Sequence, residues 1–198
     1  MTELSPAPRY TVSDVKSLVE QYFGLKCQVK SLPGYIDLNF RLEAQDGEQY
    51  ILKIANAEEP KIELEMQNAV MDFLEDAFID GVQFPKVIAN HNGDKISELR
   101  QGDNTYFLRL LTFVPGTFYV DVKNQTDKLR ANLSVSLAKL NKALVNFIHP
   151  ASGRYLIWDL KQASNVIRQF QGAIKGEIEK AHIDKILSMF ETHVMPIA

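Results

Sequence analysis

The chain has 198 residues, of which 45% are hydrophobic and 24% charged, and its formal net charge is -3. This composition is typical of a globular protein that is large enough for one sizeable core or two small lobes. The small negative charge gives no electrostatic reason to expect binding to nucleic acid or to an anionic membrane.

The single cysteine, Cys27, excludes an internal disulfide and a multi-cysteine metal site. The chain does not open with a charged region followed by an apolar run, and no stretch approaches about 18 consecutive apolar residues. We therefore expect a cytoplasmic protein without a membrane-spanning segment, in a reducing compartment.

Residues 1–10 predict a flexible lead-in. A helix is expected to begin at Thr11, because Asp14 lies three residues later as in a capping box, and Gly24 is placed to end this helix. Alternating apolar residues and turn chemistry then predict three strands, at about 26–32, 37–44 and 49–55. A glycine turn at Pro33-Gly34 and a hairpin turn at Asp46-Gly47 connect them.

The third predicted strand is apolar except for one lysine, Lys53. The period of two residues places Lys53 on the same face as Ile51 and Ala55, with Leu52 and Ile54 on the other face. A buried ammonium group without an anionic partner is costly. An edge-strand lysine that extends into water would also explain the pattern. The glycine turn before the strand and the carboxylate-rich helix after it favour a phosphate ligand instead.

The rest of the chain divides into a strand region and a helical region. After a helix at about 60–78, strands are predicted near 86–90, 94–99 and 105–112, with turns at Asn92-Gly93 and at 101–104. Leucines spaced from Leu129 to Leu144 predict one long amphipathic helix that ends near His149. Two further helices are expected at about 163–175 and 177–194.

Several short segments occur in the order seen in one enzyme family. They are Leu32-Pro33-Gly34-Tyr35 with Asp37 and Asn39-Phe40, Tyr50 to Ile54, Gln67-Asn68, Arg109 to Gly116, His149-Pro150 and Trp158-Asp159-Leu160. With them the chain resembles the aminoglycoside phosphotransferase and choline kinase family of the protein-kinase-like fold, most closely its hydroxylysine kinase branch. The resemblance extends from about residue 12 to the last residue.

The resemblance implies an ATP site between two lobes. Lys53 would hold the α and β phosphates, and the turn at Gly34 and Tyr35 would cover them. Backbone groups of Thr112 and Val114 would bind the adenine edge, and Leu111 would line the adenine pocket. The apolar run from Tyr106 to Val114 is also explained by a buried strand that ends in the turn Pro115-Gly116, whether or not ATP binds there.

Kinases place a glutamate on the helix after the lysine strand, where it holds the lysine against the phosphates. Here the resemblance places Gln67 in that position. Glu63 lies one turn earlier on the same helix face, so the partner of Lys53 is either Gln67, through a hydrogen bond, or Glu63, through its charge. A charged first turn at the positive end of a helix would also explain the glutamates.

The catalytic loop of the family is not found in the sequence. The family has His-x-Asp followed by an asparagine, then a second aspartate that binds Mg²⁺. The only His-x-Asp, His182-Ile183-Asp184, falls inside a helical pattern, and Met189 stands where the asparagine would be. We therefore assign no catalytic or metal-binding residue and expect the Mg²⁺ ligands to lie in a segment outside this sequence.

These patterns predict an α+β, protein-kinase-like fold with an antiparallel sheet of five or six strands and one inserted helix. The nucleotide-binding lobe would span 11–114, and a partial helical lobe without the catalytic loop would span 115–198. We expect the amino-terminal part of an ATP- and Mg²⁺-dependent kinase that phosphorylates a hydroxyl of an amine or amino-acid substrate. This part alone would be inactive. The alternatives are a nucleotide-binding module and an inert fragment that associates with itself through an exposed helical face.

Overall fold

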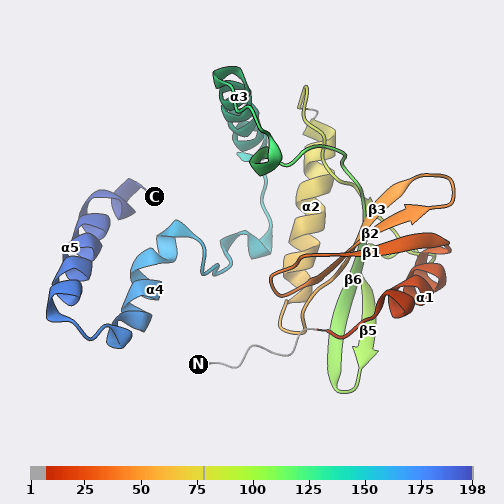
Figure 1. Cartoon of the computed structure of the whole chain (residues 1–198), viewed down its shortest axis with the longest axis horizontal. Helices are drawn as coiled ribbons and strands as arrows, with labels where there is room; N and C mark the ends of the chain where they lie inside the picture. Colours follow the sequence, from red (N-terminus) through yellow and green to blue (C-terminus); the bar gives the residue numbers. More distant parts are fainter. Residues whose placement is uncertain (1–7, 78, 198) are drawn as a thin grey trace. The chain divides into compact units, whose positions relative to one another are not determined.

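The computed structural model describes residues 8–77 and 79–197. The chain forms two compact units, of which the first ends at Ser152 and the second begins at Gly153 (Figure 1). The predicted boundary between lobes at residues 114 and 115 concerns the two sides of an ATP site and remains a prediction.

The first unit contains the whole sheet and three α-helices. Its elements are α1 (Val12–Phe23), β1 (Cys27–Leu32), β2 (Leu38–Ala44), β3 (Gln49–Ile54), α2 (Lys61–Ala77), β4 (Val87–Ile88), β5 (Ser97–Gln101), β6 (Asn104–Thr112), a 3-10 turn at Tyr119–Asp121 and α3 (Asp127–Leu144). A further 3-10 turn, Pro150–Gly153, lies where the two units meet in the chain.

The six strands form one antiparallel sheet in the order β1-β2-β3-β6-β4, and β5 also pairs with β6. β6 is long enough to pair with three strands: its first half pairs with β5, and its second half pairs with β3 on one side and β4 on the other. The prediction of an α+β fold with five or six antiparallel strands and a helix inserted after the third strand is confirmed, and the number of strands is six.

One face of the sheet is apolar and packs against α1. Strand alternation directs to this face the side chains of Phe40, Leu42, Leu52, Ile54, Leu108 and Leu110, which are buried in one cluster with Val15 and Val19 of α1. α1 begins with the predicted capping box, in which the backbone N–H and the hydroxyl of Thr11 each donate a hydrogen bond of 2.7 Å to the carboxylate of Asp14. It ends at Gly24, whose φ of 66° is in the left-handed region that favours glycine.

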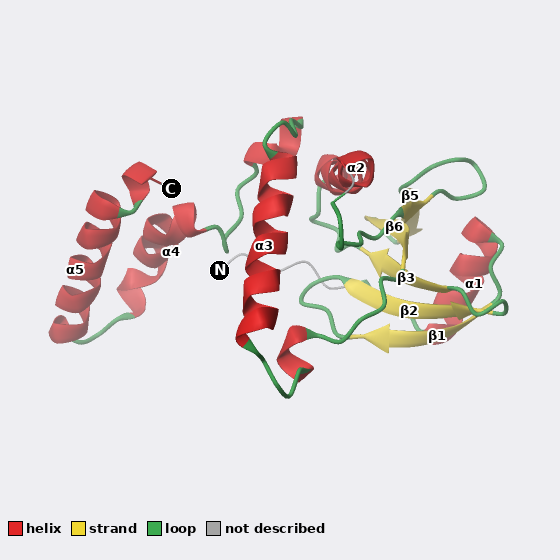
Figure 2. Ribbon diagram, turned by 90° about the horizontal axis from the view of Figure 1, so that it is seen from above, coloured by secondary structure: helices red, strands yellow, loops and turns green. Residues whose placement is uncertain are grey.

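The helix α2 lies on the opposite face of the sheet from α1 (Figure 2). Arg109 of β6 forms hydrogen bonds with this helix; it follows Leu108 in the strand and therefore points to the other face. The sheet thus has one mainly apolar face, which supplies the core, and one face with charged residues.

Two predicted strands are shorter than expected. β4 has two residues, and β5 begins at Ser97 rather than at residue 94. The reason is the side chain of Asn90, whose Oδ1 accepts the backbone N–H groups of Asn92 and Asp94 at 2.9 Å each, while its Nδ2 donates to the Ser97 hydroxyl at 2.9 Å. These bonds hold the chain in a turn up to the start of β5.

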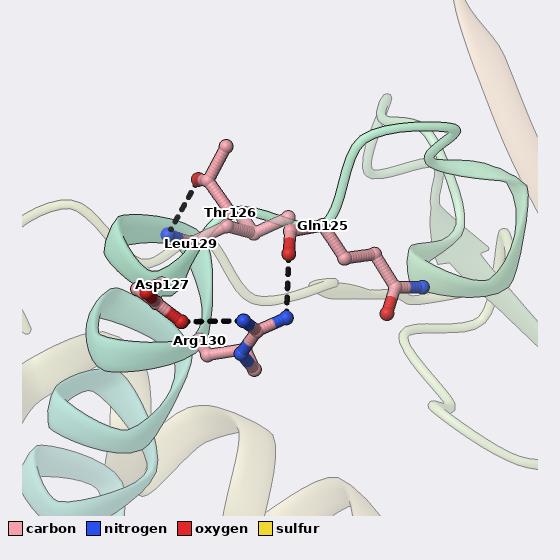
Figure 3. Close-up of polar contacts among 5 residues, drawn as sticks. All are labelled: Gln125, Thr126, Asp127, Leu129 and Arg130. Carbon is pink, nitrogen blue, oxygen red and sulfur yellow. Dashed lines mark hydrogen bonds and ion pairs between the residues drawn. The ribbon is translucent and has the colours of Figure 1, made fainter.

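The long helix α3 begins at a side-chain cap. The hydroxyl of Thr126 accepts the amide of Leu129 at 3.2 Å, and Arg130 bonds both Asp127 and the carbonyl of Gln125 (Figure 3). The helix ends at Leu144, five residues before the predicted end at His149, where the chain tightens as the amide of Phe147 donates to the carbonyl of Leu144.

The carboxyl-terminal end of α2 contacts the segment after α3. Phe73 and Phe147 meet edge to face, with ring centroids 5.5 Å apart, and Lys139 donates to the carbonyl of Asp80 at 3.5 Å. The leucine stripe of α3 is incompletely covered, because Leu133 and Leu137 are 53% and 54% exposed.

The second unit is entirely helical in its regular structure. It contains a 3-10 turn at Leu160–Gln162, α4 (Ala163–Phe170), a 3-10 turn at Gln171–Ala173, α5 (Glu177–His193) and a last 3-10 turn at Met195–Ile197. The helix predicted to reach residue 175 therefore ends at Phe170, ahead of Gly172. Within the described residues, no helix has the length and apolar character needed to cross a membrane.

Most of the predicted lead-in, residues 1–7, lies outside the described residues. The last residues before α1 contact the sheet. Tyr10 meets Tyr106 edge to face with centroids 6.5 Å apart, and the carbonyl of Arg9 accepts a hydrogen bond from Gln101 at 3.3 Å.

Candidate functional site

Lys53 lies at the centre of the polar face of the sheet. β3 is an inner strand, and Lys53 is paired across the sheet with Asn39 of β2 on one side and with Arg109 of β6 on the other. Its neighbours Leu52 and Ile54 are fully buried on the opposite face, as the alternation predicted. An edge-strand position does not explain this lysine.

A second row of paired residues lies next to the first, nearer to the end of β6. Arg41, Ile51 and Leu111 are paired across β2, β3 and β6. We call these two rows, Asn39-Lys53-Arg109 and Arg41-Ile51-Leu111, the lysine face. Leu111 and Ile51 are therefore on the same face of the sheet as Lys53, and the role of Leu111 in an adenine pocket remains a prediction.

The pKa of Lys53 is shifted by burial and by three charged neighbours. Burial lowers the pKa of its ammonium group below the ordinary value, and the positive charge of Arg109 lowers the pKa further. The carboxylates of Asp37 and Glu59 act in the opposite direction. The net pKa is lowered, so the protein side chains compensate the charge of Lys53 only in part. A bound anion would complete this compensation.

The glycine turn between β1 and β2 is tightly folded. A Cβ atom at Gly34 would lie 2.1 Å from the backbone oxygen of Asp37 and 2.8 Å from Nδ2 of Asn39, so only glycine fits there. The carboxylate of Asp37 accepts the backbone N–H of Asn56 at 3.1 Å and its side-chain amide at 3.3 Å. These hydrogen bonds connect the glycine turn to the residues that follow β3. Tyr35, at the tip of the glycine turn, is 79% exposed.

The end of β6 and the segment after it contain the two residues predicted to bind adenine, Thr112 and Val114. The amide of Thr112 donates to the carbonyl of Lys86 at 2.9 Å, and the hydroxyl of Thr112 accepts the amide of Lys86 at 2.9 Å. The amide of Thr112 is therefore occupied, and its carbonyl is the backbone group that it can offer to a ligand. Within the described residues, no hydrogen bond is formed by the amide of Val114.

A hollow of about 300 Å³ lies beside this segment. It is lined by the end of α2, the loop after it and residues 112–114, including Leu74, Phe84 and Lys86. Its lining includes neither Lys53 nor Gly34, so the hollow is distinct from the lysine face.

The two helix residues predicted as partners of Lys53 form hydrogen bonds with other residues. Gln67 accepts a hydrogen bond from Arg109 at 2.6 Å and donates one to Glu59 at 3.5 Å. Glu63 lies in the first turn of α2, where its amide donates to the carbonyl of Pro60. The choice between Gln67 and Glu63 as partner of Lys53 remains a prediction.

Sequence reasoning missed Asp37, Glu59 and Arg109 as site residues. The signal for Arg109 was present, because this arginine interrupts the apolar run of β6 in the way that Lys53 interrupts β3. Asp37 and Glu59 lie on loops, where no periodicity marks the direction of a side chain, and only the fold brings them near Lys53.

His182 and Asp184 lie inside α5, and Asp184 accepts a hydrogen bond from Gln171 at 2.6 Å. This position is the helical one that the sequence predicted. In the part of the chain that is described, no group of three or more His, Cys, Asp and Glu side chains is placed to hold a metal ion.

Comparison with known proteins places the chain among phosphotransferases. A family model described as the phosphotransferase enzyme family matches residues 28–194. A hydroxylysine kinase from Danio rerio is 23% identical in a match that covers 99% of this chain and 57% of that protein.

Two solved structures share the fold. A microcompartment-associated aminopropanol kinase superposes with a TM-score of 0.71 at 14% identity, covering 94% of this chain and 58% of that one. An amicoumacin kinase in complex with AMP-PNP, Ca²⁺ and Ami superposes with a TM-score of 0.61 at 14% identity, covering 85% of this chain and 55% of that one. The chain therefore spans just over half the length of these relatives.

We predict that Gly34→Ala loosens the glycine turn, because the added Cβ would overlap the backbone of Asp37. The hydrogen bond that the Asn56 amide donates to Asp37 should weaken. Exchange of that amide with solvent should accelerate about fivefold, as expected when the hydrogen bond loses about 1 kcal/mol of its stabilising free energy. Amide hydrogen exchange followed by NMR measures the rate. Gly172→Ala, where a Cβ meets open space, is the control and should leave the rate unchanged.

We also predict that Lys53 titrates below its ordinary pKa of 10.5. Asp37→Asn should lower the pKa further, because the carboxylate of Asp37 favours the charged form. A pH titration of the lysine Cε resonances, assigned with Lys53→Met, measures both values. A pKa at or above the ordinary value in the wild-type chain would contradict the burial of this charge.

The lowered pKa of Lys53 has a consequence for folding. Between the folded and unfolded pKa values the unfolded chain binds more protons at this position, so the contribution of Lys53 to the unfolding free energy rises with pH. The stability of the wild-type chain should therefore increase relative to Lys53→Met as the pH rises through that window. Chemical denaturation at several pH values checks this sign.

Proposed function

The chain belongs to the phosphotransferase enzyme family, and from this membership we propose that it forms the nucleotide-binding part of an ATP-dependent kinase. The reaction of the whole enzyme would transfer the γ-phosphate to a hydroxyl group of an amine or amino-acid substrate. The observation that supports this proposal most directly is the position of Lys53 on an inner strand, paired with Asn39 and Arg109 and beside a turn in which only glycine fits.

The lysine face would hold ATP in one orientation. Lys53 would bind the α and β phosphates, and the turn at Gly34 and Tyr35 would cover them. At the other end of the face, the carbonyl of Thr112 and the amide of Val114 would bind the adenine edge. Ile51 and Leu111, paired between these two ends, would contact the purine ring.

The fit to a nucleotide rests on three observations from this chain. The turn at Gly34 is folded so closely on Asp37 and Asn39 that a side chain does not fit there, which is typical of a turn that covers phosphates. The positive charges of Lys53 and Arg109 lie side by side in the register of β3 and β6. The amide of Val114 forms no hydrogen bond within the described residues, so it is able to donate to a base.

Mg²⁺ would bridge the phosphates in such a reaction. The described residues hold no carboxylate cluster that fits a metal ion, so we derive no step of the reaction from Mg²⁺ here. We propose that the metal ligands and the catalytic aspartate belong to the part of the relatives' length that this chain does not span. The 198 residues alone would then bind nucleotide without transferring phosphate.

The acceptor is proposed by similarity. The relatives are named as kinases of hydroxylysine and aminopropanol, which both combine an amine with a hydroxyl group. An amine-bearing alcohol is therefore the substrate class that we propose for the whole enzyme. A cytoplasmic location fits the single free cysteine, Cys27, and is part of the same proposal.

A second candidate function is supported by the exposed apolar residues of α3. Leu133 and Leu137 are more than half exposed although they lie on one helix face, which favours a chain that associates with itself and has no catalytic role. This candidate predicts a dimer or larger species in sedimentation experiments, and no specific binding of nucleotide.

We predict that the 198-residue chain binds ATP and that Lys53→Met weakens the binding at least tenfold, a loss of about 1.4 kcal/mol. The physical reason is the loss of the buried positive charge next to the phosphates. Isothermal titration calorimetry at neutral pH, with and without Mg²⁺, measures the affinity.

The matched control is Lys26→Met, which removes an exposed lysine that pairs with Glu20 at 3.7 Å and precedes β1. Its affinity should equal that of the wild-type chain. A folded wild-type chain that does not bind ATP would disprove the nucleotide site and leave the second candidate.

A further inference from the structure

Arg109 is the most deeply buried charged residue on the lysine face. Its side chain is 3% exposed, and it lies in the middle of β6, directly beside Lys53 across the sheet. Burial lowers the pKa of its guanidinium group, whereas Asp37 and Glu59 act against that change. An arginine at such a position needs a structural or functional reason, because burying a charge is costly.

The guanidinium group of Arg109 bonds the middle of α2. One nitrogen donates to the side-chain oxygen of Asn68 at 2.8 Å and to the backbone carbonyl of Leu64 at 3.4 Å. Another nitrogen donates to the side-chain oxygen of Gln67 at 2.6 Å. The planar fork of the guanidinium group thus spans one turn of the helix and fixes both its rotation and its height over β6.

All three acceptors are uncharged. Arg109 therefore keeps its positive charge close to Lys53, and the carboxylates of Asp37 and Glu59 favour the charged form of both side chains. Since three donors are occupied and the side chain is almost fully buried, Arg109 has no free surface on which a nucleotide could bind. Arg109 can therefore affect a bound ligand only by positioning α2 or through its own positive charge.

We infer that Arg109 is a positioning residue, which holds α2 in place over Lys53 and thereby supports nucleotide binding without touching the nucleotide. Other kinases fix this helix by an ion pair between a helix glutamate and the strand lysine. In this chain the resemblance places Gln67 in the helix position, and the side-chain oxygen of Gln67 accepts a hydrogen bond from Arg109. Arg109 of β6 therefore links the sheet to α2 one strand further along than Lys53. The inference rests on the proposed function.

The test uses two substitutions of Arg109 in the full chain. Arg109→Lys retains the charge but cannot span the three acceptors, and Arg109→Gln removes the charge. ATP affinity is measured by calorimetry, and the order of α2 by hydrogen exchange of residues 61–77. Both variants should weaken ATP binding about fivefold or more, and α2 should exchange faster while α1 is unchanged.

The matched control is Val19→Ala, which destabilises the core on the opposite face of the sheet. It should lower the melting temperature without changing the affinity for ATP or the exchange of α2. If the Arg109 variants do not fold, Asn68→Leu removes one acceptor and leaves the arginine in place. The loss of affinity should then be smaller and in the same direction.

The pH dependence of binding separates charge from packing. The groups that shift the pKa of Lys53 are Asp37, Glu59 and Arg109. Burial is the main cause of the lowered pKa of Lys53, and Arg109 is the charged neighbour that lowers it further. Arg109→Gln removes that neighbour, so the pH at which ATP affinity falls through deprotonation of Lys53 should rise. Arg109→Lys and Val19→Ala should leave the midpoint where it is in the wild-type chain.

The outcomes distinguish the inference from the proposed function. If Lys53→Met weakens binding but every Arg109 or Asn68 variant binds like the wild-type chain, the positioning role is wrong and the nucleotide site stands. If Val19→Ala weakens binding as much as Arg109→Lys, the effect is one of general stability and the inference is also wrong. A wild-type chain that binds no ATP overturns both.

Discussion

Two positive charges held side by side on one face of the inner strands are the constraint on which the structure of the site depends. Lys53 and Arg109 are neighbours across β3 and β6 on the same face of the sheet. The sheet and α2 reduce the contact of both side chains with water. Like charges at this separation repel each other, and burial adds to the cost. The fold meets this cost in two ways: it gives Arg109 three hydrogen-bond acceptors, and it places Asp37 and Glu59 near both charges.

The burial of the apolar face of the same strands offsets this free-energy cost. Leu52, Ile54, Leu108 and Leu110 alternate with the charged residues and are fully buried against α1. Their burial, worth about 1.5–3 kcal/mol for each side chain, fixes the strands in register without help from the polar face. The polar face is therefore free to hold a partly uncompensated charge, which is what a phosphate-binding surface requires.

The alternation of residues was enough to predict the six strands, the inserted helix and the direction of Lys53, because strand period and turn chemistry are local properties. The same local information failed where side chains from distant segments decide the structure. Asn90 holds residues up to Asp94 in a turn and shortens β5, and Asp37 and Glu59 reach the site from loops. Arg109 carried the same signal as Lys53, an isolated charge in an apolar strand, and its contacts with α2 became visible only in the fold.

We propose that nucleotide binds on the lysine face, between the glycine turn and the segment after β6. The most direct test is NMR of the ¹⁵N-labelled chain titrated with ATP. Amide resonances at both ends of the face, Gly34 and Tyr35 at one end and Val114 at the other, should shift together with one affinity. Those of Val15 and Val19 on the opposite face should stay in place. Shifts confined to α1, or at only one end of the lysine face, would contradict the account.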